Sequence, residues 1–258
     1  MESSSASRTD PGAGAPAPPT ILGAGYVGRA LLARFPRADA THRQRSAAPR
    51  THVFDLEDPQ SWGNPPLAGR NVIWTFPAAP LARVQQFHEA RLQQVAGLIV
   101  LGSTSAYRLA VSDAGTVATI DESAALDLDQ PRVQGEEWLR AQGATVLQLA
   151  GIFGPGREPA DWLRSGRIKD GAKLVNLVHV DDIVSVIAQL LAQPMPGRRL
   201  NVATGEPVAW RELAAEWKRQ GKVPADLALP SSRAGEYGKR VEVTRLQALL
   251  PDHRFRQP

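Results

Sequence analysis

The sequence contains no cysteine in its 258 residues. This absence excludes a disulfide scaffold, catalysis by a thiolate, and zinc or iron–sulfur centres held by Cys ligands. Histidine is scarce as well, and its five copies stand at positions 42, 52, 88, 179 and 253. Because no two of them have a metal-ligand spacing such as i, i+4, we expect no metal site.

Long apolar runs and a strong charge of one sign are also missing. Hydrophobic residues make up 43% of the chain, but no run approaches the ~20 residues that a membrane span needs. The 30 Lys and Arg residues against 26 Asp and Glu residues give a net charge of only +4. We therefore expect a globular protein that has a small-molecule substrate and neither a nucleic-acid nor a membrane partner.

The chain begins with a segment of low complexity. Residues 1–19 are mostly Ser, Ala, Gly and Pro, without the continuous apolar core of a secretory signal. We expect a disordered tail there and a cytoplasmic location. The rest has the length of a nucleotide-binding domain, expected over residues 20–205, followed by a small C-terminal subdomain over residues 206–258.

From Thr20 onward, short apolar runs alternate with longer amphipathic segments. This alternation is typical of βαβ units and a parallel sheet. The continuously apolar runs suit strands that helices cover on both faces. The fold predicted is an α/β protein with an open, doubly wound, Rossmann-type parallel sheet, and its ligand would lie beyond the carboxyl ends of the strands. The expected helices include residues 26–35, 81–95, 181–192 and 209–220.

The strongest local signal is a glycine-rich turn between the first strand and the first helix. Gly23, Gly25 and Gly28 have the GxGxxG spacing of dinucleotide-binding turns. Gly23 permits the tight turn, Gly25 lets the backbone approach a pyrophosphate, and Gly28 lets helix and strand pack closely. The amides of Tyr26 and Val27 would then face the phosphates at the helix N-terminus. The alternative is a purely structural turn, because glycines gather in turns for steric reasons.

The choice between NAD and NADP depends on the end of the second strand. An NAD site usually has an acid about 20 residues after the first glycine, and Arg43 stands there. Because a guanidinium pairs with a 2′-phosphate, we favour NADP(H) over NAD(H). Two alternatives stay open. Asp39 could be the ribose-binding acid, or the cations of this region could form a solvated face made of Arg34, Arg37, Arg43, Arg45 and Arg50.

Several segments together resemble the NAD-dependent epimerase/dehydratase family, the extended or atypical short-chain dehydrogenase/reductases. The resemblance covers residues 21 to about 205. It rests on the order and spacing of the segments ILGAGYVGRALL, FDLED, LGSTSAYR, LAGIFGPGR, LVHVDDIV and LNVATGE. It implies a nicotinamide cofactor and a C-terminal subdomain that caps the substrate.

The resemblance also implies roles for particular residues. Asp55 and Leu56 would lie beside the adenine, and Ser103 would orient the substrate. The loop of residues 151–156 would run near the nicotinamide and the substrate, so that residues 151–173 contribute to the substrate side. The residues expected to pass along the cofactor after the fourth strand are Thr75, Phe76 and Pro77.

The chain departs from the family at the catalytic pair. Classical members use a Tyr-x-x-x-Lys pair, in which the Lys charge lowers the pKa of the Tyr. No such pair occurs here, because Ala30, Val111 and Val241 stand four residues after the three tyrosines, and Asp129 and Val133 stand at the expected positions.

Three further residues bear on catalysis. Tyr107 is the nearest candidate for an acid or base, with packing at a strand end as the alternative. His179 could titrate near neutral pH, although packing or a backbone bond is the alternative. Asp182 is expected to cap the following helix. Core packing is likewise the favoured interpretation of Trp162, Trp210 and Trp217 over the floor of a pocket.

Two functions follow from the sequence. The first is an NADP-dependent oxidoreductase or epimerase-like enzyme acting on a small carbonyl, a hydroxyl or a nucleotide-sugar-like substrate. Ser103 and Tyr107 are its candidate catalytic residues. The alternative is a catalytically silent NADP-binding or redox-sensing module, which the missing Tyr-x-x-x-Lys pair favours. Fold alone does not choose between them.

Overall fold

A computed structural model describes residues 17–108, 117–229 and 235–258. The expected tail at residues 1–19 therefore lies, up to residue 16, outside the described residues. Seven parallel strands form the central sheet in the order β11-β7-β5-β4-β1-β2-β3. Their bounds are β1 Thr20–Leu22, β2 Asp39–His42, β3 Thr51–Val53, β4 Asn71–Trp74, β5 Gly97–Ser103, β7 Thr145–Leu149 and β11 Arg199–Val202. This confirms the predicted doubly wound, Rossmann-type α/β sheet.

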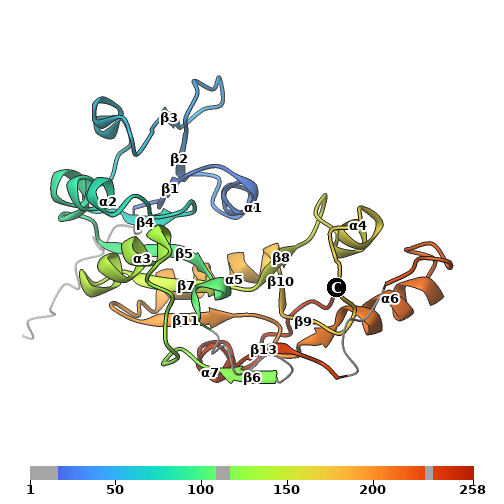
Figure 1. The fold of residues 1–258 in the computed structure, drawn as a ribbon. Coiled ribbons are helices and arrows are strands. Elements are labelled where there is room, and N and C mark those ends of the chain that lie inside the picture. The colour runs from blue at the N-terminus through green and yellow to red at the C-terminus, as the bar shows by residue number, and fades with distance from the viewer. Residues whose placement is uncertain (1–16, 109–116, 230–234) are drawn as a thin grey trace, which may run out of the picture.

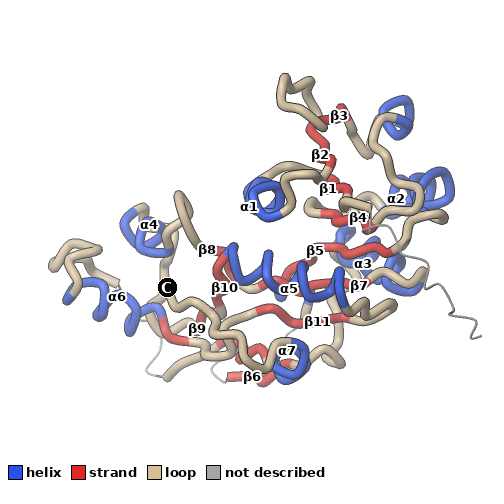
Figure 2. The backbone as a smooth tube through the Cα atoms, turned by 180° about the vertical axis from the view of Figure 1, so that it is seen from behind, coloured by secondary structure: helices blue, strands red, loops and turns tan. Residues whose placement is uncertain are grey.

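Apolar residues on both faces of each strand explain the two covering layers. Ile99 and Leu101 of β5 belong to one core cluster, whereas Val100 between them belongs to the other. Alternate side chains point to opposite faces, so a continuously apolar strand buries both. One face is covered by α1 (Tyr26–Arg34), α5 (Val180–Ala192) and α7 (Thr244–Leu249), and the other by α2 (Leu81–Phe87) and α3 (Pro131–Ala141) (Figures 1 and 2).

The helix bounds agree closely with the sequence pattern. The first helix ends one residue earlier than expected, and the segment expected at 81–95 is α2 followed by a π-helical turn, η2 (His88–Leu92). Two short 3₁₀ helices, η1 (Pro59–Gly63) and η3 (Thr104–Ala106), lie in connections. Within the ranges described, every helix is too short or too polar to cross a membrane.

A smaller group of elements lies beyond the carboxyl end of β7 (Figure 1). It has its own apolar core, in which Trp210 and Trp217 are buried, as the packing interpretation predicted. This core places residues 153–177 against residues 208–229. The elements are β8 (Gly151–Phe153), α4 (Pro159–Arg164), β9 (Leu174–Val175), β10 (Leu177–His179), β12 (Val208–Ala209) and α6 (Trp210–Arg219).

A separate two-stranded sheet pairs the C-terminal region with a segment that precedes α3. β13 (Gly238–Val241) runs parallel to β6 (Val117–Ile120), with Lys239 opposite Ala118. The side chain of Asn176 fixes β13 further: its amide nitrogen donates to the Lys239 carbonyl at 2.8 Å, and its oxygen accepts from the Val241 amide at 3.0 Å. Residues far apart in the sequence therefore lie side by side here.

Candidate functional site

The glycine-rich turn is fastened to both neighbouring strands. The Gly23 amide donates to Thr41 Oγ1 of β2 at 2.8 Å, and Thr75 Oγ1, just after β4, donates to the Gly23 carbonyl at 2.6 Å. Gly23 has φ of 95°, a conformation that glycine adopts without strain. The turn is thus held in one geometry before any ligand arrives.

Gly25 and Gly28 lack a Cβ for different physical reasons. A Cβ on Gly28 would stand 2.2 Å from the Gly23 carbonyl oxygen, so only glycine lets helix α1 approach the turn. A Cβ on Gly25 would meet no atom within 4 Å and would point into open space. Gly25 is the N-cap of α1, and no side chain caps the helix there. The first amides of α1 are therefore available to an anion.

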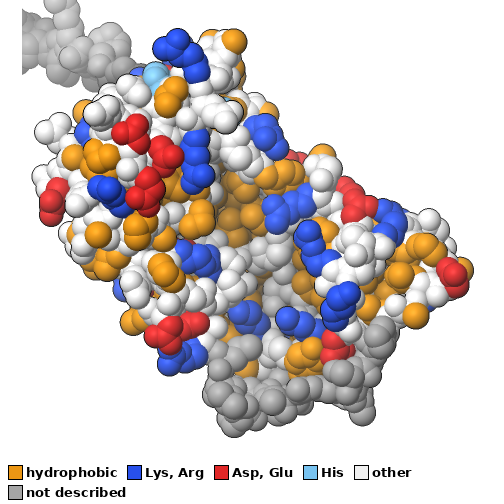
Figure 3. All heavy atoms as spheres, turned by 45° about the horizontal axis from the view of Figure 1, so that its top comes forward, with side chains coloured by type: hydrophobic (Ala, Val, Ile, Leu, Met, Phe, Trp, Pro, Cys, Tyr) orange, Lys and Arg blue, Asp and Glu red, His pale blue; other side chains and the backbone are white. Residues whose placement is uncertain are grey.

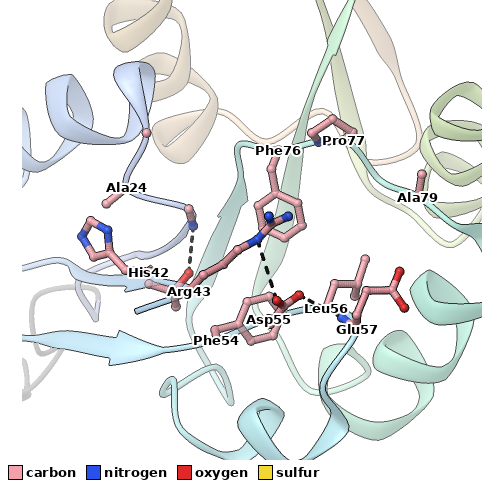
Figure 4. A pocket seen from close by; sticks show the side chains of 13 residues that line it. Ala24, His42, Arg43, Phe54, Asp55, Leu56, Glu57, Phe76, Pro77 and Ala79 are labelled. Carbon is pink, nitrogen blue, oxygen red and sulfur yellow. Dashed lines mark hydrogen bonds and ion pairs between the residues drawn. The ribbon is translucent and has the colours of Figure 1, made fainter. Parts of the chain in front are cut away.

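Next to this turn lies a cavity of about 460 Å³ (Figure 4). It opens at the carboxyl ends of β1, β2, β3 and β4, where a doubly wound sheet is expected to bind its ligand. Two aromatic rings, Phe54 and Phe76, stand 6.1 Å apart in its wall. The lining residues are Gly23, Ala24, Gly25, Thr41, His42, Arg43, Phe54, Asp55, Leu56, Glu57, Phe76, Pro77 and Ala79.

The cavity brings together seven of the eleven residues predicted to bind the cofactor. These are Gly23, Gly25, Arg43, Asp55, Leu56, Phe76 and Pro77. The other four, Tyr26, Val27, Gly28 and Thr75, are not among the lining residues. Thr75 contributes indirectly, because its hydroxyl bonds to the Gly23 carbonyl and holds the turn in place. Sequence reasoning missed lining residues such as Thr41 and Phe54, although each stands within two positions of a predicted residue. That adjacency was the only available signal.

One end of the cavity is polar. Arg43 and Asp55 reach toward each other across it, with Arg43 Nε 3.8 Å from Asp55 Oδ2 (Figure 4). The Arg43 side chain is 81% exposed, so its guanidinium is free to turn toward a ligand. The two side chains offer a cation for a phosphate and a carboxylate for a hydroxyl within one small region.

The alternative acid, Asp39, lies at the wrong end of β2. It is the first residue of that strand and pairs with Thr20, the first residue of β1. Its buried carboxylate accepts from His52 Nε2 at 2.7 Å and Arg70 Nη1 at 2.5 Å. Burial by itself raises the pKa of Asp39, but these bonds bring it below its usual range. Asp39 is therefore a structural residue remote from the carboxyl edge.

The loop after β8 meets the glycine-rich turn. Tyr26 Oη donates to the Pro155 carbonyl at 3.2 Å, and the Arg157 guanidinium stands 5.6 Å from the centre of the Tyr26 ring. Burial raises the pKa of Tyr26. Gly154 has φ of 139°, and a Cβ added to it would lie about 3 Å from both Tyr26 Oη and His179 Nε2. The loop therefore approaches these two side chains closely at a glycine. The predicted loop of residues 151–156 thus lies against Tyr26, the first residue of α1.

Ser103 and Tyr107 follow β5 but have different surroundings. Ser103 Oγ accepts from the Ser105 amide at 3.2 Å and stays partly exposed at the strand end. Tyr107 is 3% exposed, and its hydroxyl donates to Asn201 Oδ1 at 2.5 Å. Burial raises the pKa of this phenol further above 10. The packing alternative for Tyr107 therefore has a definite physical basis, whereas Ser103 remains accessible.

The positions expected to carry the Tyr and Lys pair do not line the cavity. Asp129 precedes α3 and bonds to Arg108 at 2.9 Å on the surface. Val133 is fully buried in α3. The same helix carries Glu136, a fully buried residue whose Oε1 accepts from Arg132 at 3.3 Å. Burial raises the pKa of Glu136 to about 7.

The N-terminus of α5 corrects one expectation. Asp182 does not cap this helix, because His179 Nδ1 accepts the capping bond from the Asp181 amide at 3.1 Å. The fully buried Asp182 carboxylate instead accepts from His253 Nε2 at 3.1 Å and from the Arg256 amide at 2.8 Å. Asp182 thus anchors the C-terminal segment. The backbone-bonded alternative for His179 is confirmed.

No family model matches the chain. Among curated proteins, Protein YeeZ of Escherichia coli (strain K12) is 33% identical over 128 residues, which is 47% of this chain and 45% of that protein. The chain thus matches less than half the length of this relative.

Solved structures resemble the chain over almost its whole length. A short-chain dehydrogenase/reductase superfamily protein from Agrobacterium tumefaciens with bound NAD has a TM-score of 0.71 at 14% identity, covering 92% of both chains. MoeE5 in complex with UDP-glucose and NAD has a TM-score of 0.69 at 18% identity, covering 93% of both. RMD from Pseudomonas aeruginosa, complexed with NADPH, has a TM-score of 0.65 at 19% identity, covering 90% of both. The chain has the fold of the short-chain dehydrogenase/reductase and epimerase/dehydratase proteins.

Proposed function

We propose that the chain binds a nicotinamide dinucleotide, NADP(H) in preference to NAD(H), in the cavity beside Gly23 and Gly25. With it the chain acts as an oxidoreductase or epimerase-like enzyme on a small carbonyl, a hydroxyl or a nucleotide-sugar-like substrate. The observation that carries the proposal is the empty space beside the Gly25 Cα, faced by the uncapped N-terminus of α1. A pyrophosphate fits there, because backbone amides and the helix dipole both favour an anion.

The rest of the cavity suits the remainder of such a cofactor. Phe54, Leu56 and Phe76 give the apolar wall that a flat base requires. Arg43 supports the preference for a 2′-phosphate through a charge-assisted hydrogen bond. Asp55, 3.8 Å from Arg43, could instead accept from a ribose hydroxyl, so the two cofactors must be compared directly. Structures similar to this chain contain NAD in one case and NADPH in another. They support a nicotinamide cofactor but do not distinguish NADP(H) from NAD(H).

The cofactor, when bound, supplies hydride exchange at its nicotinamide ring. This chain's own residues bind and orient. Ser103 Oγ, partly exposed at the end of β5, would donate a hydrogen bond to a substrate oxygen and fix its distance from the ring. The similarity to MoeE5, solved in complex with UDP-glucose, supports nucleotide sugars as one substrate group to test.

A catalytically silent NADP-binding or redox-sensing module is the second candidate. The buried, Asn201-bonded hydroxyl of Tyr107 favours it, because Tyr107 is the tyrosine nearest to Ser103 in the sequence and does not line the cavity. In such a module nucleotide binding would change a partner-binding surface, and no substrate would be turned over.

Two measurements test the proposal. Calorimetry with NADPH, NADP⁺, NADH and NAD⁺ should give binding of all four, with the phosphorylated pair tighter. No binding of any of them would reject the proposal. A panel of small carbonyls and nucleotide sugars with NADPH should then give turnover that falls in Ser103→Ala. Binding without turnover across the panel would favour the silent module.

A further inference from the structure

Beside Ser103 stands a group of positive charges that comes from three separate parts of the chain. Lys239 of β13 donates from Nζ to the Thr104 carbonyl, one residue after Ser103. Arg132 of α3 donates from Nη2 to Ser105 Oγ at 2.9 Å, and Ser105 Oγ lies 3.2 Å from Ser103 Oγ. We call Arg132, Lys173 and Lys239 the basic cluster.

These charges lie close enough to influence one another. The pKa of Lys239 is lowered to about 8, first by its partial burial and then by the positive charges of Lys173 and Arg132. Lys239 meets a backbone carbonyl rather than a carboxylate here, because its Nζ donates to the Thr104 carbonyl. A partly buried ammonium without an acidic partner is costly, and so are like charges held together.

Among the described residues, Glu136 is bonded to the basic cluster, and its carboxyl compensates the positive charge only in part. Glu136 accepts from Arg132, but the pKa of Glu136 is itself raised to about 7, so near neutral pH a large fraction of this carboxyl carries no charge. Within the described part of the chain, the positive charge of Lys239 and Arg132 beside Ser103 thus exceeds the negative charge bonded to it. An added oxyanion would lower the cost of holding them there.

Hydrogen bonds and strand pairing hold two members of the basic cluster, Lys239 and Arg132, in place. The side-chain amide of Asn176 bonds to the Lys239 carbonyl and to the Val241 amide of β13, and parallel pairing with β6 fixes the register of that strand. Arg132 is held by Ser105 and Glu136 together. Figure 3 shows Lys and Arg side chains gathered around the hollow between the two parts of the molecule.

We propose that Lys239 and Arg132 form an oxyanion site next to Ser103, so that the substrate carries a carboxylate or a phosphate group close to the carbon that reacts. This inference rests on the proposed function, because it names the class of substrate for the same site. Lys173 is exposed and adds positive charge close enough to lower the pKa of Lys239. The site is separate from the glycine-rich turn, which follows β1, because β4 lies between β1 and β5 in the sheet.

The test uses malonate and inorganic phosphate as probes, with uncharged malonamide as the matched control ligand. Calorimetry compares the wild type with Lys239→Gln, Arg132→Gln, and Arg240→Gln, the last being an exposed neighbour on the same strand. We expect the wild type and Arg240→Gln to bind malonate equally and malonamide not at all. Lys239→Gln and Arg132→Gln should each weaken malonate at least about tenfold, and Lys239→Arg should restore much of the loss.

Parallel titrations with NADP⁺ separate this inference from the proposed function. Unchanged NADP⁺ affinity in the two Gln variants places the loss at the basic cluster and shows that they are folded. Phosphate bound at the glycine-rich turn would be insensitive to both substitutions. Malonate affinity that is equal in all variants, or absent from the wild type, overturns the oxyanion site even if NADP⁺ binds well. Failure of NADP⁺ alone overturns the proposed function.

Discussion

The Gly23 carbonyl oxygen stands 2.2 Å from the point at which a Cβ on Gly28 would lie, whereas a Cβ on Gly25 would contact nothing. Two glycines of one motif thus have separable roles, the first in packing and the second in leaving room for a ligand. A purely structural turn would need only the packing role.

Gly25→Ala should abolish or strongly weaken dinucleotide binding while the free energy of unfolding changes by less than about 1 kcal/mol, since the backbone there has φ of −72°. Gly28→Ala should instead destabilise the fold by about 1–3 kcal/mol through overpacking. Denaturant unfolding and calorimetry with NADPH measure the two effects. If Gly25→Ala binds NADPH like the wild type, the turn is structural and the proposed cofactor site is wrong.

Arg43→Glu should weaken NADPH much more than NADH, by about tenfold or more, because the new carboxylate would repel a 2′-phosphate and not a hydroxyl. Arg45→Glu makes the same change of net charge outside the cavity lining and serves as the control. Equal losses for the two cofactors, or equal effects of the two variants, would mean that Arg43 belongs to a solvated cationic face.

Tyr107→Phe should lower the free energy of unfolding by about 1–3 kcal/mol, because it leaves the Asn201 amide oxygen buried without its donor. Since the hydroxyl faces Asn201, we expect kcat/KM for any substrate found to stay near the wild-type value. Ser103→Ala should show the opposite pattern, with stability kept and kcat/KM reduced. A large loss of turnover in Tyr107→Phe at unchanged stability would instead identify the phenol as the catalytic acid.

The sequence predicted the sheet, the glycine-rich turn and the polar edge at Arg43, because those features depend on local periodicity and on residues close together in the chain. It did not predict that Lys239 reaches Thr104 or that Asp182 binds the segment around Arg256. Both contacts join residues more than 70 positions apart, and no periodic pattern records such a pairing. Glu136 was missed for a related reason, since its complete burial depends on how α3 packs against β5 and β7.

Glu136 gives a prediction about pH. Its carboxyl has a pKa near 7 in the folded protein against an ordinary value of 4.5, so between these values the folded state holds a proton that the unfolded state has lost. The contribution of Glu136 to the free energy of unfolding is therefore fully present below pH 4.5 and is lost as the pH rises through about 7. The free energy of unfolding falls by ~3 kcal/mol over this range on account of Glu136.

Glu136→Gln removes the ionisable group and keeps a neutral side chain of similar shape. The free energy of unfolding of the variant minus that of the wild type should thus shift in the variant's favour by ~3 kcal/mol between pH 4.5 and pH 8. Urea unfolding at five or six pH values measures it, with exposed Glu212→Gln as the control. The amide oxygen of the variant can still accept from Arg132, and the attraction between Arg132 and the ionised carboxylate is already contained in the pKa of about 7. A difference that stays flat across this range would show that Glu136 is ionised throughout, and the basic cluster would then be more fully neutralised than the oxyanion site requires.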